Sequence, residues 1–134
     1  MSGSLNKKRF VIDTNVIFMS LYDVNSKASK IIELANQEKV ELFSPESVKE
    51  ELSRVLKREM DFSEEEVLFL IGTLPVTWIK KEFYNEFLDK TKVKHKDDKP
   101  IEAVSLMLDC GILSADYDFK DRLDINKLLR ELGC

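Results

Sequence analysis

Cysteine, histidine, glycine and proline are all scarce in this chain of 134 residues, with two Cys, one His, four Gly and three Pro. Cys110 and Cys134 are too few for a disulfide framework, and no Cys/His spacing indicates zinc. We therefore expect a reduced, cytoplasmic protein. The single His95 lies in a lysine-rich stretch, where a solvated side chain is the simpler interpretation than a ligand or a catalytic base.

Long apolar runs and linker-like segments are missing as well. No run approaches the roughly 18 residues that a membrane span needs, and residues 1–10 lack the apolar stretch of a signal peptide. The sequence shows no repeat and no low-complexity tract, while hydrophobic residues make up 43% and charged residues 34% of it. We expect one globular domain over residues 1–134 that does not associate with a membrane.

An excess of basic residues is also missing, since 21 Lys and Arg stand against 25 Asp and Glu. The net charge is -4 and the isoelectric point is about 5.2, whereas domains that bind nucleic acid are usually basic. A cluster of acids around a divalent cation would account for such a balance, because the bound ion inverts the local field. The acidic composition therefore does not exclude a nucleic-acid substrate.

Short apolar runs typical of strands alternate with stretches whose apolar residues recur at helical spacing. Strands are expected at 9–12, 40–43, 76–79 and 112–115, and residues 122–125 are a candidate for a fifth. Helices are expected at 15–21, around 28–35, from 45 onward, from 63 to about 72–75, and at 82–90, 100–109 and 124–132. This alternation predicts a three-layer α/β/α fold with a central, mostly parallel sheet of four to five strands.

Several residues predict where the helices begin and end. Ser and Asp favour the position before a helix, proline favours its first turn, and glycine favours the position after it. The expected start signals are Ser26, Ser44-Pro45 and a capping box of Ser63 with Glu66, and the expected stop of helix 100–109 is Gly111.

Two acids stand where a strand is expected to end. Asp13 follows the first strand, and Asp116 follows the fourth, with Asp118 two residues later. In open parallel sheets, ligands bind outside the carboxyl ends of the strands, so both acids are candidates for a site. Each also has a plainer interpretation, because Asp13 is a favoured helix cap and Asp116 is common in turns.

Helices place two further acids, Glu51 and Asp98. On the helix that starts at Pro45, Glu51 lies at the edge of the apolar stripe and Glu50 lies nearly opposite. We therefore expect Glu51 to lean toward the sheet and Glu50 to face water. Asp98 directly precedes the helix 100–109, and Asp97 is an alternative for the same position. The plainer interpretations are a boundary residue reaching solvent for Glu51 and a cap at the positive end of the helix for Asp98.

The four acids together predict a metal site. Converging carboxylates repel one another unless a cation lies between them, and a set of oxygen ligands suits one or two Mg²⁺ or Mn²⁺ ions. Such ions promote the attack of water on a phosphodiester. With one His and an expected buried Cys110, no Ser-His-Asp set or reactive thiol competes with this chemistry.

Four segments resemble the motifs of PIN domains, in order and over nearly the whole chain: Val11-Ile12-Asp13-Thr14-Asn15-Val16-Ile17, Ser44-Pro45 through Glu51-Leu52 to Val55-Leu56, Asp98-Lys99-Pro100-Ile101-Glu102-Ala103, and Ile112-Leu113-Ser114-Ala115-Asp116-Tyr117-Asp118-Phe119. One departure is Ser114-Ala115, where many relatives carry Thr-Gly. The resemblance implies that Asp13, Glu51, Asp98 and Asp116 are the catalytic metal ligands, with Asp118 as an accessory acid and Thr14, Asn15 and Ser114 in support.

The resemblance also implies an activity and partners. The expected activity is metal-dependent endonucleolytic cleavage of single-stranded RNA, in a protein that forms a homodimer. Small PIN domains of the VapC type are toxins neutralised by an antitoxin protein, while others process RNA without one, and the sequence does not separate these roles. Lys94, Lys96 and Lys99 flank Asp98 and are weak candidates for contacts to RNA, with a solvated surface as the plainer interpretation.

Two other functions compete with the nuclease. A catalytically inert PIN-like module that binds RNA or a protein would have no need of mutually repelling carboxylates. A signalling receiver domain would need an aspartate after a central strand, whereas the expected strand at 76–79 is followed by Lys80-Lys81. The sequence therefore favours the nuclease.

Overall fold

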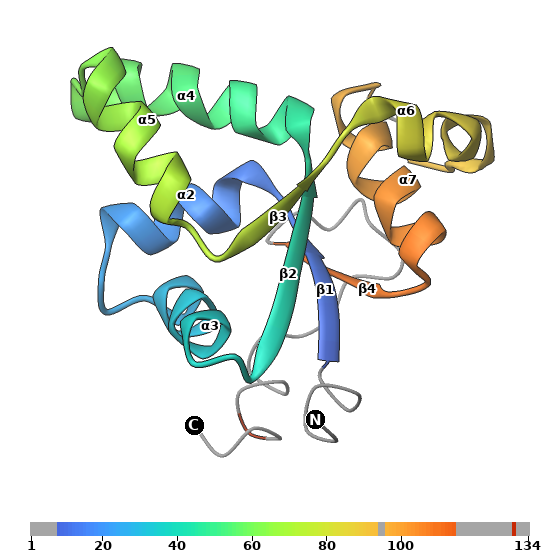
Figure 1. Ribbon diagram of the computed structural model, residues 1–134, viewed down its shortest axis with the longest axis horizontal. Helices are drawn as coiled ribbons and strands as arrows, with labels where there is room; N and C mark the ends of the chain where they lie inside the picture. The colour runs from blue at the N-terminus through green and yellow to red at the C-terminus, as the bar shows by residue number, and fades with distance from the viewer. Residues whose placement is uncertain (1–7, 94–95, 115–129, 131–134) are drawn as a thin grey trace.

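A computed structural model describes residues 8–93, 96–114 and 130, and its centre is a four-stranded sheet in which every pair of neighbours is parallel (Figure 1). The strands are β1 (Lys8–Ile12), β2 (Val40–Pro45), β3 (Val76–Ile79) and β4 (Gly111–Leu113). Their order across the sheet is β3-β2-β1-β4, so β1 and β2 are the two inner strands. This order brings the carboxyl ends of β2, β1 and β4 side by side.

Helices cover both faces of the sheet (Figure 1). One layer holds α2 (Thr14–Tyr22), α3 (Lys27–Asn36), α4 (Glu46–Met60) and α5 (Glu64–Thr73), and the other holds α6 (Lys81–Tyr84), the 3-10 helices η1 (Asn85–Lys90) and η2 (Lys96–Asp98), and α7 (Lys99–Leu108). The predicted three-layer α/β/α architecture is therefore confirmed. The fifth strand predicted at 122–125 and the helix predicted at 124–132 lie outside the described residues.

The two inner strands carry the core. Val11, Ile12 and Leu42 are fully or almost fully buried, because helices pack against both faces of β1 and β2. From α4, Leu52 and Leu56 enter this core from one side, and α7 packs from the other side. Within the part of the chain that the structure describes, no helix is long and apolar enough to cross a membrane.

Two of the predicted helix starts are confirmed at the level of hydrogen bonds. The Ser26 hydroxyl accepts a bond of 3.1 Å from the Ser29 N–H at the start of α3. At the start of α5, the Glu66 N–H donates to the Ser63 hydroxyl at 3.2 Å, and the Ser63 N–H donates back to the Glu66 carboxylate at 2.9 Å. This capping box satisfies two backbone donors that a helix end would otherwise leave unpaired.

Two local predictions were wrong. Ser44 does not cap α4, because β2 extends through Pro45 and the buried Ser44 hydroxyl instead donates to the Ile12 carbonyl at 2.8 Å. Asp109, with φ of 51°, ends α7 in the left-handed conformation, so the expected stop Gly111 is already part of β4. The helix expected at 82–90 is confirmed in position, as the short α-helix α6 that continues as the 3-10 helix η1.

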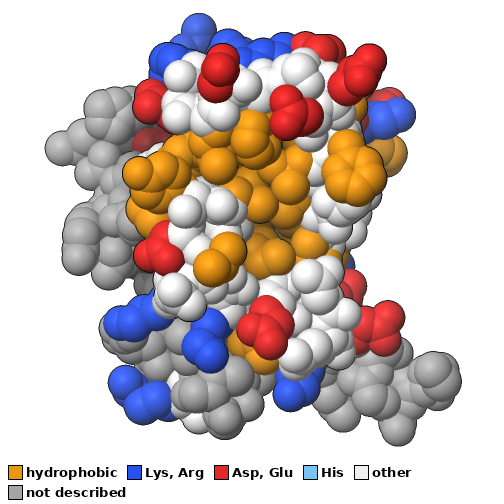
Figure 2. Space-filling view, turned by 90° about the vertical axis from the view of Figure 1, so that its left-hand side faces the viewer, with side chains coloured by type: hydrophobic (Ala, Val, Ile, Leu, Met, Phe, Trp, Pro, Cys, Tyr) orange, Lys and Arg blue, Asp and Glu red, His pale blue; other side chains and the backbone are white. Residues whose placement is uncertain are grey.

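One side of the molecule exposes a broad apolar area. Figure 2 shows hydrophobic side chains gathered on the face built from the helices α2 to α5, with acidic side chains along one border. The helices α2 and α5 and the turn after α2 contribute the exposed side chains Met19, Tyr22, Val24, Leu68 and Phe69. A contiguous apolar surface is typical of a protein contact.

Candidate active site

Asp13 occupies the corner between β1 and α2. Its side chain is only 6% exposed, and one carboxylate oxygen accepts a hydrogen bond of 3.0 Å from the Val16 N–H in the first turn of α2. The other oxygen accepts a hydrogen bond from the buried Ser114 hydroxyl. Ile12 and Leu113, the last residues of β1 and β4, are paired in the sheet. Asp13 and Ser114 directly follow them, so their side chains meet. Asp13 is thus both the helix cap and a buried acidic side chain at the sheet edge.

The residues beside Asp13 differ in exposure. Thr14 is buried, and its hydroxyl is the one buried side-chain polar atom that lacks a hydrogen-bond partner within the described part of the chain. Buried hydroxyls are almost always paired, so this atom marks a position where a bound water, ion or substrate would be stabilised. Asn15 is exposed in the first turn of α2.

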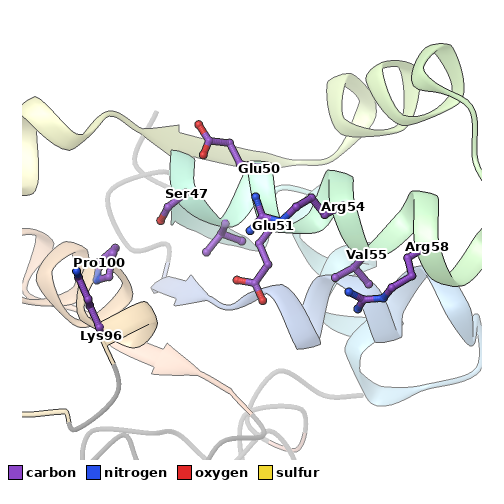
Figure 3. Close-up of a pocket in the computed structure, with 9 residues that line it drawn as sticks. Ser47, Glu50, Glu51, Arg54, Val55, Arg58, Lys96 and Pro100 are labelled. Atoms are coloured by element: carbon purple, nitrogen blue, oxygen red, sulfur yellow. The ribbon is translucent and has the colours of Figure 1, made fainter.

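Glu51 does not lean into the sheet as predicted, and it is exposed on α4. The prediction failed because the stripe that enters the core is narrow: Val48, Leu52 and Leu56 are buried, and position 51 lies beyond its edge. Figure 3 shows the Glu50 and Glu51 carboxylates pointing to different sides of the helix. Glu51 therefore faces solvent, on the same side of α4 as Arg54 and Arg58, where the three residues form one wall of a pocket (Figure 3).

That wall belongs to a pocket of about 470 Å³ between α4 and the junction of η2 with α7. Glu51, Arg54 and Arg58 line it from α4, and Lys96 and Pro100 line it from the other side (Figure 3). The pocket therefore joins the predicted acid of the second motif to the segment that carries the third. Lys96, a predicted contact to substrate, is exposed there, and Lys99 is half-buried as the first residue of α7.

Asp98 is the residue before α7 and is half-buried. Its side chain makes no capping hydrogen bond to the first turn of that helix, so the plainer interpretation as a side-chain cap is not what the geometry shows. The side chain of Asp97 lies outside the described residues, and the choice between the two acids stays open. Pro100 lies in the first turn of α7, where proline needs no backbone partner.

The other predicted site residues, Asp116, Asp118 and Lys94, lie outside the described residues. Among the residues that are described, no group of three or more His, Cys, Asp or Glu is close enough to hold a metal ion. The donor chemistry nevertheless fits a hard divalent cation, because Asp13, Glu51 and Asp98 offer oxygen atoms only and the Thr14 hydroxyl adds a buried oxygen without a partner. Ser114, expected to support Asp116, donates to Asp13 in this structure.

Two other titratable groups near the sheet show no sign of a catalytic role. Burial raises the pKa of the half-buried Cys110 thiol, which makes its nucleophilic thiolate scarcer. Burial also raises the pKa of Tyr84, against a hydrogen bond with Ser47 that lowers it.

Arg54 and Arg58 were missed by the sequence reasoning. They follow Glu51 by three and seven residues, which places all three on one face of a helix. That spacing was visible in the sequence, but charged residues on a helix are usually a solvated face. The pocket distinguishes these two arginines from the other cations of α4.

The sequence profile of the PIN domain family matches residues 11–128. This match covers most of the chain and includes all the acids proposed for the site. No curated protein matches the chain. The parallel sheet, the helices on both faces and the acid at the end of β1 agree with the match. The chain therefore belongs to the PIN domain family, whose fold is of the nuclease type.

Proposed function

We propose that this protein is an endoribonuclease that hydrolyses phosphodiester bonds of single-stranded RNA with the help of Mg²⁺ or Mn²⁺. The observation that carries the proposal is the corner at Asp13, where a carboxylate is buried at the carboxyl edge of a parallel sheet next to the unpartnered Thr14 hydroxyl. Burying a carboxyl group costs free energy, and a helix cap alone does not require that burial.

The proposed ligands are Asp13, Glu51, Asp98 and Asp116, with Asp118 as an accessory. A divalent ion, when bound, supplies an acidified water and a counter-charge for the phosphoryl oxygens. Within this chain, the Ser114 hydroxyl and the Val16 N–H hold both oxygens of Asp13 in one orientation. Glu51 reaches the pocket from an exposed position, so it can adjust to what is bound there.

The test is cleavage of a labelled single-stranded RNA by the full chain with and without Mn²⁺ or Mg²⁺. Cleavage should need the ion, and Asp13→Asn should abolish it while the circular dichroism spectrum stays native, because Asn also caps a helix. Asp89→Asn, an exposed acid on η1, is the matched control and should cleave normally. Full activity of Asp13→Asn would overturn the mechanism.

The alternative is a catalytically inert module that binds RNA or a protein. It would be favoured if the wild-type chain bound single-stranded RNA without cutting it and if calorimetry detected no binding of Mg²⁺ or Mn²⁺ at millimolar concentration. The toxin role, the antitoxin partner and the homodimer remain predictions from the family resemblance. The exposed apolar area on α2 and α5 is a surface on which a protein partner could be sought.

A further inference from the structure

The pocket beside Glu51 contains two guanidinium groups that the proposed metal site does not use. Arg54 and Arg58 line it from α4, and both residues are exposed. Figure 3 shows both side chains reaching back along the helix toward Glu51, as side chains on an α-helix tend to do. The two cations therefore border the space that Glu51 faces.

The spacing along α4 is regular. With a rise of about 1.5 Å per residue, Arg54 lies about 4.5 Å and Arg58 about 10.5 Å beyond Glu51 along the helix axis. The two arginines are thus about one helical turn apart, a separation comparable to that of successive phosphates in an extended nucleic-acid strand. Lys96 adds a third cation from the opposite wall.

Neighbouring acids do not fully neutralise these cations. In the part of the chain that the structure describes, Arg54 forms no ion pair, although Glu50 precedes it by the four residues that favour one. Arg58 pairs through Nε with Glu59 at 2.9 Å, and both side chains are more than half exposed, so the pair is weak. An anion that enters the pocket would therefore have to displace only the weak Arg58–Glu59 ion pair.

The charge balance of the pocket depends on Glu51. The pocket is lined by three cations, Arg54, Arg58 and Lys96, and by two acids, of which Glu51 points toward the cations and Glu50 points to a different side of α4 (Figure 3). If Glu51 is committed to a divalent ion, three cations remain against one acid, and the pocket attracts anions. Planar guanidinium groups match phosphate oxygens with paired hydrogen bonds, which makes phosphate the ligand class that this arrangement suits best.

We infer that Arg54 and Arg58 bind two successive backbone phosphates of the single-stranded RNA, on one side of the bond that is cut. This inference rests on the proposed ribonuclease function. The strand would run along α4 away from Glu51, with Lys96 across the pocket. Because the contacts are to the backbone, they contribute affinity without sequence preference.

The test measures binding of a fluorescein-labelled single-stranded RNA to the full chain by anisotropy, with Ca²⁺ in place of the activating ion to prevent cleavage. Arg54→Gln/Arg58→Gln should raise Kd roughly 10- to 100-fold at fixed salt. The slope of log K against log salt should also fall in magnitude by roughly 1.4, since each phosphate contact contributes about 0.7 on a single strand. In cleavage assays with Mn²⁺, KM should rise and kcat at saturating RNA should stay close to wild type.

The matched control is Lys49→Gln/Lys57→Gln, which removes the same charge from α4 at residues that do not line the pocket. It should leave both Kd and the salt slope close to wild type. Equal weakening by the two double variants, or an unchanged Kd in the arginine variant while the wild type binds and cleaves RNA, would overturn this inference alone. A wild-type chain that neither binds nor cleaves single-stranded RNA would instead remove the proposed function on which it rests.

Discussion

Asp13 and Glu51 are acids of the same proposed site, but the fold holds them in different ways. Asp13 is buried, and both of its oxygens accept hydrogen bonds from groups that the backbone fixes in place. Glu51 is exposed on the second turn of α4, in a pocket that it shares with the exposed side chains of Arg54, Arg58 and Lys96. Asp13 is packed among β1, β4 and α2, whereas Glu51 lies on the solvent-exposed surface of α4.

This difference has an energetic consequence. A buried polar group is coupled to stability, because its removal leaves partners unsatisfied in a low-dielectric environment. An exposed side chain away from caps and ion pairs usually changes stability by less than about 0.5 kcal/mol. Substitutions at the Asp13 corner should therefore affect both folding and activity, and substitutions at the α4 wall should affect activity alone.

The largest effect is expected at Asp13. Asp13→Ala removes the cap of α2 and leaves the Val16 N–H and the Ser114 hydroxyl without their acceptor, so the free energy of unfolding should fall by about 2 kcal/mol or more. Asp13→Asn keeps the cap and should lose well under half of that. Urea unfolding monitored by circular dichroism measures both values.

The two Asp13 variants also test the contrast drawn between Asp13 and Glu51. Both are expected to be inactive, so activity alone cannot separate capping from catalysis, whereas stability can. Should Asp13→Ala be as stable as Asp13→Asn, the hydrogen bonds at this corner would carry no weight, and the two acids would not differ in the way argued.

Much of the fold around Asp13 could be predicted from sequence, because its causes are local. The β-branched apolar run before Asp13 predicts a strand that is buried on both faces, and the cap at Ser63 with Glu66 was confirmed bond for bond. Ser44 shows where this reasoning stops. A serine before a proline looks like a helix cap, but its hydroxyl bonds to a carbonyl 32 residues away, across the pairing of β1 with β2. The register of β1 against β2 decides whether the Ser44 hydroxyl bonds to the first turn of α4 or to the Ile12 carbonyl.

The site was predicted less completely than the fold. Helical periodicity separates Glu50 from Glu51 in direction, but it does not say how wide the buried stripe of α4 is, and that width left Glu51 in solvent. The meeting of α4 with the start of α7 depends on how two helices from opposite layers reach one sheet edge. No local pattern contains that information, so Arg54 and Arg58 went unrecognised.

The second expected effect is at Glu51. Glu51→Gln should lower cleavage of single-stranded RNA by at least tenfold, because a neutral amide is a poor ligand for a hard divalent ion. Its free energy of unfolding should stay within about 0.5 kcal/mol of wild type, in contrast to Asp13→Ala. Cleavage rates with Mn²⁺ and urea unfolding of the same protein provide the two numbers.

Glu50→Gln is the control for Glu51→Gln, since it removes an equal charge from the neighbouring residue on α4, whose carboxylate points to a different side of the helix. It should retain most of the activity. Equal losses in the two variants would mean that the general charge of α4 matters rather than the position of Glu51. A large loss of stability in Glu51→Gln would show that the α4 wall is coupled to the core after all.

The smallest effect is expected at Glu66, an exposed acid whose role is structural. Its carboxylate accepts a hydrogen bond from the Ser63 backbone N–H, and this bond, together with the nearby Ser63 hydroxyl, lowers the pKa of Glu66. A lowered pKa in the folded state means that the charged form stabilises the fold above the unfolded pKa of about 4.3. That contribution is lost as the pH falls through the still lower folded value.

Glu66→Gln keeps the capping box but cannot titrate. Its difference from wild type in free energy of unfolding should therefore shrink as the pH falls from about 7 to about 3, and its RNA cleavage at pH 7 should equal that of wild type. A difference that stays constant with pH would mean that the charge of Glu66 contributes nothing to the cap. A loss of cleavage would show that an exposed acid that does not line the pocket also affects activity.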